Sequence, residues 1–178
     1  MIRIVEDFVD PTVYLNRDMR FRDIPEDSVW HNRVGELDDD LGLPLLERLH
    51  ETINATADQT VWADMLNYSI WRVGDNQTPH ADGQRNDGTP NEFPWRTVGC
   101  VLYLNDGYTG GSIYFPQHDL ELSPKPGTLV WFPGTAEFLH GVRPVESGER
   151  ITISSFWGPN PPHRHPYYSI DGSIRSAP

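Results

Sequence analysis

The pattern of hydrophobic and polar positions changes near residue 61, from helical spacing to short apolar runs. Before that point, aliphatic side chains recur on one helical face between residues 44 and 54, and Pro44 suits the first position of a helix. This pattern predicts a helix over 44–54. A weaker helical turn is expected over 5–9, before Asp10 and Pro11 interrupt it. The aliphatic positions of the longer helix are Leu45, Leu46, Leu49 and Ile53.

From residue 61 to residue 157 the chain predicts β-strands. Short apolar and β-branched runs are separated by clusters of Gly, Pro, Asn and Asp, which is typical of an all-β sandwich or barrel. The expected strands cover residues 65–72, 97–104, 111–115, 128–132 and 151–157. Helices followed by strands predict a mostly β protein with supporting helices, an α+β fold in which N-terminal helices pack on one sheet of a double-sheet barrel.

A single domain accommodates these elements, because 178 residues match the usual size of one domain. We expect residues 1–60 to form a helical support within that domain. Residues 61–157 are expected to form the barrel core, and residues 158–178 a proline-rich C-terminal extension.

Composition and charge narrow the function classes. The 14 basic and 26 acidic residues give a net charge of −12, which counts against binding to nucleic acid or to an anionic membrane, because both need a basic surface. No apolar run approaches the roughly 18 residues of a membrane span, and the N-terminal segment turns acidic too soon for a secretory signal. The only cysteine, Cys100, cannot form an internal disulfide. We therefore expect a cytoplasmic protein, and the sequence leaves its oligomeric state open.

Two histidines and one aspartate form a candidate metal site. His80 and Asp82 are two residues apart, so on an extended segment their side chains point to the same face. This spacing alone is weak evidence, because most such pairs lie in surface loops. His140 follows a strongly apolar predicted strand and a short turn. Two histidines and one carboxylate are the facial ligand set of non-haem ferrous iron, although zinc accepts the same three residues.

Arg150 opens the last predicted strand, on which Thr152 and Ser154 share its face and two isoleucines occupy the other. If the isoleucine face packs against the support, the polar face lines the barrel interior, where a cation needs an anionic partner. The planar fork of a guanidinium can hold both oxygens of a carboxylate. The alternative is that the polar face meets solvent, as on many exposed strands. Arg150 thus predicts either a buried carboxylate ligand or a surface ion pair.

Seven segments between residues 65 and 157 combine these residues into a larger pattern. They are Trp71-Arg-Val-Gly-Asp75, His80-Ala-Asp82, Val101-Leu-Tyr-Leu-Asn-Asp106, Gly110-Gly-Ser-Ile-Tyr114, Gly127-Thr-Leu-Val-Trp-Phe-Pro133, His140-Gly-Val142 and Gly148-Glu-Arg-Ile-Thr152. In order and spacing they resemble the catalytic core of the iron(II) and 2-oxoglutarate-dependent dioxygenases, and within them the prolyl 4-hydroxylase-like group. The resemblance implies a double-stranded β-helix, the jelly-roll barrel that cupins also have.

The resemblance implies a role for each candidate residue. His80, Asp82 and His140 bind iron(II) and form the catalytic set. The cosubstrates are 2-oxoglutarate and dioxygen, with ascorbate as an auxiliary. The implied reaction hydroxylates an unactivated C–H bond while 2-oxoglutarate is oxidatively decarboxylated to succinate and CO2. The residues assigned to 2-oxoglutarate are Arg150, Tyr103 and Thr152.

The resemblance also bears on the substrate. The best candidate is a proline in a peptide or protein, and the alternative is a free amino acid or another small molecule. Two positions where the family often carries tyrosine hold Trp71 and Gln77, so the contacts of those tyrosines are not implied. Because Asp82 is present, halogenation, which needs that carboxylate to be absent, is disfavoured. The polar loop over residues 83–94 is either a cover over the site or a plain surface connection.

Two other function classes fit parts of the pattern. A noncatalytic cupin-like barrel would use the metal structurally, but cupins more typically bring three histidines and a glutamate, and they have no use for Arg150. A zinc hydrolase would need a placed general base, and none is recognisable. His163 and His165 repeat the two-residue spacing in a proline-rich setting without a neighbouring carboxylate, which predicts a solvated tail.

Overall fold

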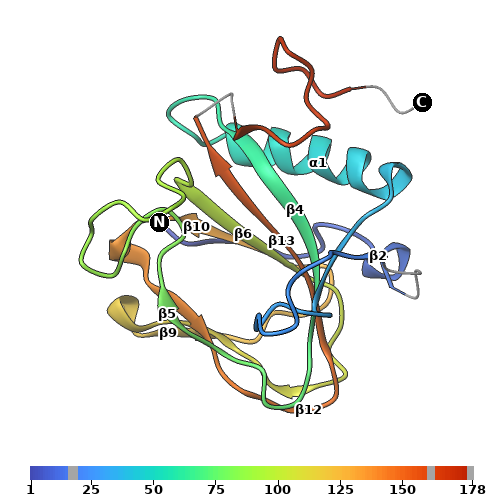
Figure 1. Ribbon diagram of the computed structural model, residues 1–178, viewed down its shortest axis with the longest axis vertical. Helices are drawn as coiled ribbons and strands as arrows, with labels where there is room; N and C mark the ends of the chain where they lie inside the picture. Colours follow the sequence, from blue (N-terminus) through green and yellow to red (C-terminus); the bar gives the residue numbers. More distant parts are fainter. Residues whose placement is uncertain (16–19, 160–162, 176–178) are drawn as a thin grey trace.

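Two antiparallel sheets face each other in the computed structural model, which describes residues 1–15, 20–159 and 163–175 (Figure 1). The larger sheet has the order β1 (Arg3–Val5), β10 (Leu129–Pro133), β6 (Val98–Tyr103), β13 (Arg150–Gly158), β4 (Trp62–Trp71), β3 (Val34–Glu36) and β2 (Arg20–Phe21). The smaller sheet has the order β5 (Gln77–His80), β11 (His140–Val142), β8 (Ile113–Phe115) and β9 (Leu120–Leu122). A third pair joins β7 (Thr109–Gly110) to β12 (Val145–Ser147), and short 3₁₀ turns cover Pro11–Val13, Pro116–His118 and Ala136–Phe138.

This arrangement is the predicted jelly-roll, and all five predicted strands are present. On β13 the predicted alternation also holds. Arg150 and Thr152 are buried toward the space between the sheets, whereas Ile153 and Trp157 are buried in the core on the opposite face. The smaller core between the two sheets is formed by Tyr103, Ile113, Phe115, Val130 and Phe132.

Helix α1 (Asp39–Asn54) covers the outer face of the larger sheet, where it lies across β4 and β13 in Figure 1. Its four predicted apolar residues are almost fully buried against that sheet. The predicted start at Pro44 is wrong, because the helix begins five residues earlier and includes Pro44 in its second turn. Asp38 is the N-cap residue and has an extended backbone. The carboxylates of Asp39 and Asp40 lie in the first turn, where the positive end of the helix dipole interacts favourably with them.

The first sixty residues contribute strands as well as a helical support. The predicted turn over 5–9 is wrong, because β1 pairs with β10 and is followed by a turn without regular helix. β3 pairs with β4, and α1 is the only α-helix in the described ranges, so the support is one helix rather than several. β1, β2 and β3 were not predicted, because two or three residues do not by themselves establish an alternating pattern. The division at residues 60 and 157 stays a prediction.

The C-terminal segment packs over the helix side of the molecule, above α1 in Figure 1. Tyr167 and Tyr168 are buried in the same core as the helix. The predicted solvated tail is wrong for His165, which is only partly exposed and whose backbone amide donates to the carbonyl of Ala63 at 2.7 Å. Burial, followed by the charge of Arg22, lowers the pKa of this histidine to about 4. His163 is exposed but stacks on the ring of Trp95 at 3.6 Å. Among the described residues, no helix is long and apolar enough to cross a membrane.

Candidate active site

His80 and His140 lie directly opposite each other on two neighbouring strands of the smaller sheet. β5 ends at His80, β11 begins at His140, and these two residues are register partners. Their ring centroids are 4.4 Å apart. The pairing of two short strands therefore places both imidazoles side by side at the inner surface of the barrel.

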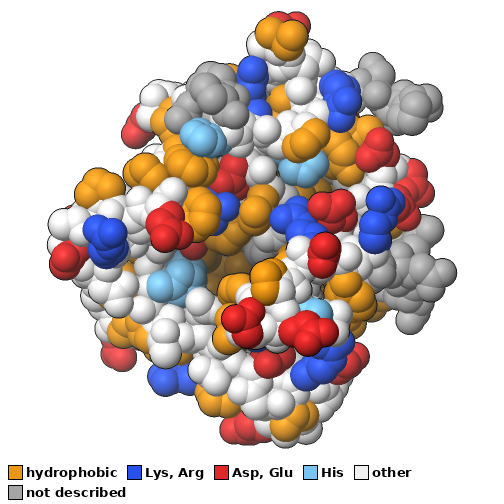
Figure 2. All heavy atoms as spheres, viewed as in Figure 1, with side chains coloured by type: hydrophobic (Ala, Val, Ile, Leu, Met, Phe, Trp, Pro, Cys, Tyr) orange, Lys and Arg blue, Asp and Glu red, His pale blue; other side chains and the backbone are white. Residues whose placement is uncertain are grey.

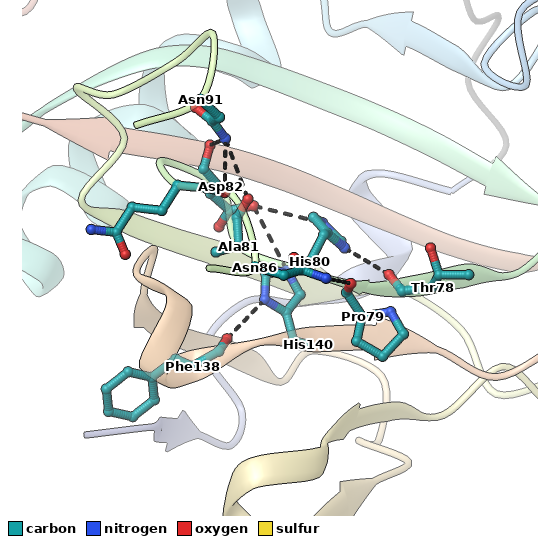
Figure 3. A network of polar contacts seen from close by, with 10 residues as sticks. Thr78, Pro79, His80, Ala81, Asp82, Asn86, Asn91, Phe138 and His140 are labelled. Atoms are coloured by element: carbon teal, nitrogen blue, oxygen red, sulfur yellow. Dashed lines mark hydrogen bonds and ion pairs between the residues drawn. The ribbon is translucent and has the colours of Figure 1, made fainter. Parts of the chain in front are cut away.

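Backbone carbonyls fix which nitrogen of each ring is free. Nδ1 of His80 lies 3.0 Å from the carbonyl of Thr78, and Nδ1 of His140 lies 3.2 Å from the carbonyl of Phe138. A carbonyl only accepts hydrogen bonds, so each Nδ1 carries the proton and donates. The lone pair is then on Nε2 of each ring, as a metal ligand requires. Figure 3 shows both rings directed toward Asp82.

Asp82 completes the group from the loop that follows β5. Its Oδ1 lies 3.8 Å from Nε2 of His80 and 3.7 Å from Nε2 of His140. The side chain of Asn91 donates to the backbone carbonyl of Asp82 at 3.0 Å, and the amide of Gly83 donates to Gly134 at 2.9 Å. These bonds hold the loop so that the carboxylate points inward, between the two histidines.

The three residues fit a bound cation. Each offers one ligand atom, and these atoms lie within 4.8 Å of one another. Oδ2 of Asp82 is buried without a hydrogen-bond partner in the described part of the chain. Burial raises the pKa of Asp82 to about 6, although the charges of His80 and Arg96 act in the opposite direction. Burial, followed by the charge of His80, lowers the pKa of His140 to about 3. A metal ion would offset the cost of the buried carboxylate and bind two neutral imidazoles.

Gly99 on β6 makes room for the carboxylate of Asp82. A Cβ at this position would collide with Oδ2 of Asp82 and would lie 2.9 Å from the ring of Phe132. We did not predict this contribution, because a glycine inside a strand pattern does not reveal what approaches it across the barrel. Its role depends on tertiary contact alone.

Replacing Gly99 by alanine is expected to displace the Asp82 carboxylate and to lower the affinity for ferrous iron by roughly 10–100-fold, the range seen when residues that orient metal ligands are changed. Competition with a chelator measures this affinity. Gly107→Ala is the control, because a Cβ at Gly107 meets no atom within 4 Å. Equal iron affinity of Gly99→Ala and Gly107→Ala would contradict the role assigned to Gly99.

Arg150 lies deep in the barrel, on the larger sheet. It is 1% exposed, and its Nη2 donates to the Tyr103 hydroxyl at 3.2 Å. Its Nε is buried without a partner, and no ion pair joins Arg150 to a carboxylate within residues 1–15, 20–159 and 163–175. The alternative of a surface ion pair is therefore wrong. A buried cation without an anion is unfavourable, so this position calls for an anionic ligand.

A cavity of about 100 Å³ connects Arg150 to the three candidate ligands. Arg150 and Thr152 line it, together with His80, Asp82 and His140. Tyr103 is not among the residues that line it, although its hydroxyl accepts a hydrogen bond from Arg150. The contact predicted between Tyr103 and 2-oxoglutarate stays a prediction.

Trp71 and Gln77, which replace the tyrosines often found in the family, both line this inner cavity. Trp71 is the register partner of Arg150 on β4, and the Arg150 guanidinium lies 5.1 Å from the centroid of its ring. The indole Nε1 has no hydrogen-bond partner among the described residues. Gln77 begins β5, three residues before His80. The inner cavity therefore has polar groups beyond those that we predicted.

A second cavity of about 430 Å³ adjoins the first and shares His80 and Asp82 with it. Figure 2 shows the molecule hollowed between the two sheets, with hydrophobic side chains inside the hollow. Phe93 of the loop over residues 83–94 lines this second cavity, so that loop is more than a plain surface connection. Sequence patterning missed the other contributors, which come from separate segments of the chain. They include Trp30, Asn67, Arg96 and Phe156.

Comparison with known proteins agrees with this geometry. The model of the 2OG-Fe(II) oxygenase superfamily matches residues 64–158, more than half of the chain. The chain belongs to the 2OG-Fe(II) oxygenase superfamily. Membership favours the predicted oxygenase over the zinc hydrolase and over the noncatalytic cupin-like barrel. Iron(II), 2-oxoglutarate and dioxygen are accordingly the cofactor and cosubstrates of this oxygenase, and the three candidate ligands fit the metal.

Individual relatives of this oxygenase are prolyl hydroxylases. Prolyl 3-hydroxylase 1 of Gallus gallus is 33% identical over 79 residues, and prolyl 3-hydroxylase 2 of Rattus norvegicus is 29% identical over 97 residues. These matches cover 42% and 48% of the chain but only 11% and 14% of the relatives. The oxygenase described here thus corresponds to a small part of those longer proteins.

Solved structures with the same fold cover nearly the whole chain. The truncated viral collagen prolyl hydroxylase from Paramecium Bursaria Chlorella virus-1 has a TM-score of 0.67 at 19% identity, and the match covers 88% of each chain. A Pseudomonas putida prolyl-4-hydroxylase has a TM-score of 0.60 at 20% identity and covers 89% of this chain and 92% of its own. At this identity the likeness confirms the predicted fold.

Proposed function

We propose that this oxygenase hydroxylates a proline residue in a peptide or protein, and that it couples this step to the oxidative decarboxylation of 2-oxoglutarate to succinate and CO2. The observation that carries the proposal is the cavity that joins three convergent metal-ligand side chains to the buried Arg150, which has no carboxylate partner among the described residues. A metal site alone would suit many reactions. A metal site with a buried cation in the same small cavity suits an anionic, chelating cosubstrate.

The residues divide the work between them. His80, Asp82 and His140 hold the iron, which supplies the activation of dioxygen when it is bound. Arg150 pairs with the far carboxylate of 2-oxoglutarate, and Thr152 lies beside it on the same face of β13. Because Arg150 and Thr152 are almost fully buried, water is excluded from this end of the cosubstrate, and the ion pair between Arg150 and the carboxylate is stronger than it would be in water.

The prolyl substrate is supported by the relatives, all of which are named as prolyl hydroxylases in the comparisons above. They include both 3- and 4-hydroxylases, so the position of hydroxylation is part of the test. We also propose that the protein binds neither nucleic acid nor an anionic membrane, on the basis of its net charge of −12. A cytoplasmic location is a further proposal, which the single cysteine supports.

The proposed reaction is tested in two stages. Purified protein is first mixed anaerobically with ferrous iron, and 2-oxoglutarate is expected to produce a weak visible charge-transfer band. Admission of air is then expected to produce succinate, with a mass gain of one oxygen in a proline-containing peptide and either 3- or 4-hydroxyproline after hydrolysis. Iron binding without the band and without succinate would contradict the proposal.

A further inference from the structure

Asn67 is a buried carboxamide that makes no hydrogen bond with any described residue. It lies on the inner face of β4 with 8% of its surface exposed, and its Oδ1 is buried without a partner. Asn91 also lines the second cavity, but its Nδ2 donates to the carbonyl of Asp82 and its Oδ1 accepts from the amide of Phe93. Buried amides are nearly always hydrogen-bonded, and an unsatisfied one is costly. The unmet capacity of Asn67 therefore points to a ligand.

The position of Asn67 places it where a substrate would meet the metal site. It lines the second cavity of about 430 Å³, here called the outer cavity, which His80 and Asp82 also line. Its register partner on β13 is Ser154, whose side chain lines both cavities. The inner faces of β4 and β13 thus change along their length, from Trp71 and Arg150 at the cosubstrate end to Asn67 and Ser154 nearer the outer cavity.

Both arginines that line the outer cavity already lie within salt-bridge distance of a carboxylate, although Nε of Arg22 makes no hydrogen bond with a described residue. Arg22 contacts Glu36 at 3.2 Å, and Arg96 contacts Asp64 at 2.6 Å. Among the described residues that line the cavity, Asp82 is the only acid, and it belongs to the metal site. A free amino acid brings an ammonium group and a carboxylate, and burial of either without a partner is unfavourable. The cavity is therefore better suited to an uncharged group.

The other residues that line the outer cavity favour a substrate with a flat or apolar group next to an amide. Trp30, Phe93 and Phe156 line the cavity with Met65 and Ile24. A carboxamide offers two donors and one acceptor oxygen, which complement the carbonyl and N–H of a peptide group. The Ser154 hydroxyl can take either role beside it.

We propose that Asn67, with Ser154 beside it, hydrogen-bonds a backbone amide of the substrate and orients the substrate against the metal site. The oxygenase accordingly takes a residue embedded in a peptide and not the free amino acid. This inference rests on the proposed function and adds a substrate-positioning residue to it.

The substrate form is tested on the iron-loaded protein with 2-oxoglutarate. The probes are capped tripeptides of the form acetyl-Gly-X-Gly-amide, in which X is each of the twenty amino acids, and the same twenty free amino acids. Capped peptides of at least one kind are expected to accelerate succinate formation, and the free amino acids are not. Stimulation by a free amino acid alone, or by neither set, would overturn the inference. Failure of the proposed function would differ, because 2-oxoglutarate would then give no charge-transfer band even before a probe is added.

The role of Asn67 is tested with Asn67→Leu, which keeps a similar volume and removes the hydrogen bonds. The apparent Michaelis constant for the best capped peptide is expected to rise by about 10-fold or more. The ratio of succinate to hydroxylated product is also expected to rise, because a misoriented substrate is hydroxylated less often per turnover. Ser154→Ala is expected to change both quantities in the same direction by less.

The control for this substitution is Asn76→Leu, at an exposed asparagine in the turn before β5. The Asn76→Leu protein is expected to have the same Michaelis constant for the peptide and the same ratio of succinate to hydroxylated product as the unchanged protein. Thermal unfolding of all variants separates loss of fold from loss of orientation. An Asn67→Leu protein that is folded and unchanged in both the Michaelis constant and the product ratio would overturn the role of Asn67.

Discussion

Replacing Asp82 by alanine is expected to abolish 2-oxoglutarate turnover and to lower the affinity for ferrous iron by more than about 100-fold, beyond the effect of changing a residue that only orients a ligand. Asp82 supplies the only carboxylate at the point where Nε2 of His80 and Nε2 of His140 converge, among the residues that the structure describes. Succinate formation measures turnover, and chelator competition measures the iron affinity.

The matched control for this change is Asp58→Ala, at an exposed aspartate that follows α1. Its turnover and its iron affinity are expected to equal those of the unchanged protein. Circular dichroism shows whether each variant is folded. A folded Asp82→Ala protein that retains turnover would mean that the metal is held elsewhere.

Replacing Arg150 by leucine is expected to raise the apparent constant for 2-oxoglutarate by roughly 30-fold or more, because removal of one partner of a buried charge pair costs about 2–5 kcal/mol and 1.4 kcal/mol is tenfold. Iron affinity is expected to remain largely intact, since Arg150 is not among the three candidate ligands. Addition of 2-oxoglutarate is expected to raise the unfolding temperature of the unchanged protein and not that of Arg150→Leu. The latter readout does not depend on catalysis.

The control for Arg150 is Arg143→Leu, which removes an exposed arginine paired with Glu121 at 3.0 Å. Exposed pairs of this kind contribute little, so this variant is expected to bind 2-oxoglutarate normally. An unchanged constant for 2-oxoglutarate in Arg150→Leu would refute the assignment of Arg150 to the cosubstrate.

The candidate site was largely predictable because its residues belong to local patterns. The two-residue spacing of His80 and Asp82 and the alternation around Arg150 are visible in the sequence, and the structure brings them together with His140. Gly99 and Asn67 were not predictable in this way. Their contributions depend on which atoms approach them across the barrel, and a single sequence does not carry that information.

The fold was also predictable only where the local sequence pattern is clear. Long strands with clear alternation, such as β4 and β13, were predicted, whereas β5 and β11 are too short for periodicity to identify. The start of α1 was misplaced because Pro44 suits a first helical position, while the acidic residues before it extend the helix by five residues. Packing of Leu43 and Leu45 against the larger sheet stabilises a helix that carries the exposed Pro44 in its second turn, against the local preference of proline.

A crystal structure of the protein grown with manganese(II), as a redox-stable substitute for ferrous iron, and with 2-oxoglutarate tests the central claim most directly. Anomalous scattering is expected to locate one metal ion bound by Nε2 of His80, Nε2 of His140 and the carboxylate of Asp82. The far carboxylate of 2-oxoglutarate is expected to contact the guanidinium of Arg150. A metal ion bound by other residues, or a cosubstrate whose far carboxylate lies away from Arg150, would contradict the account.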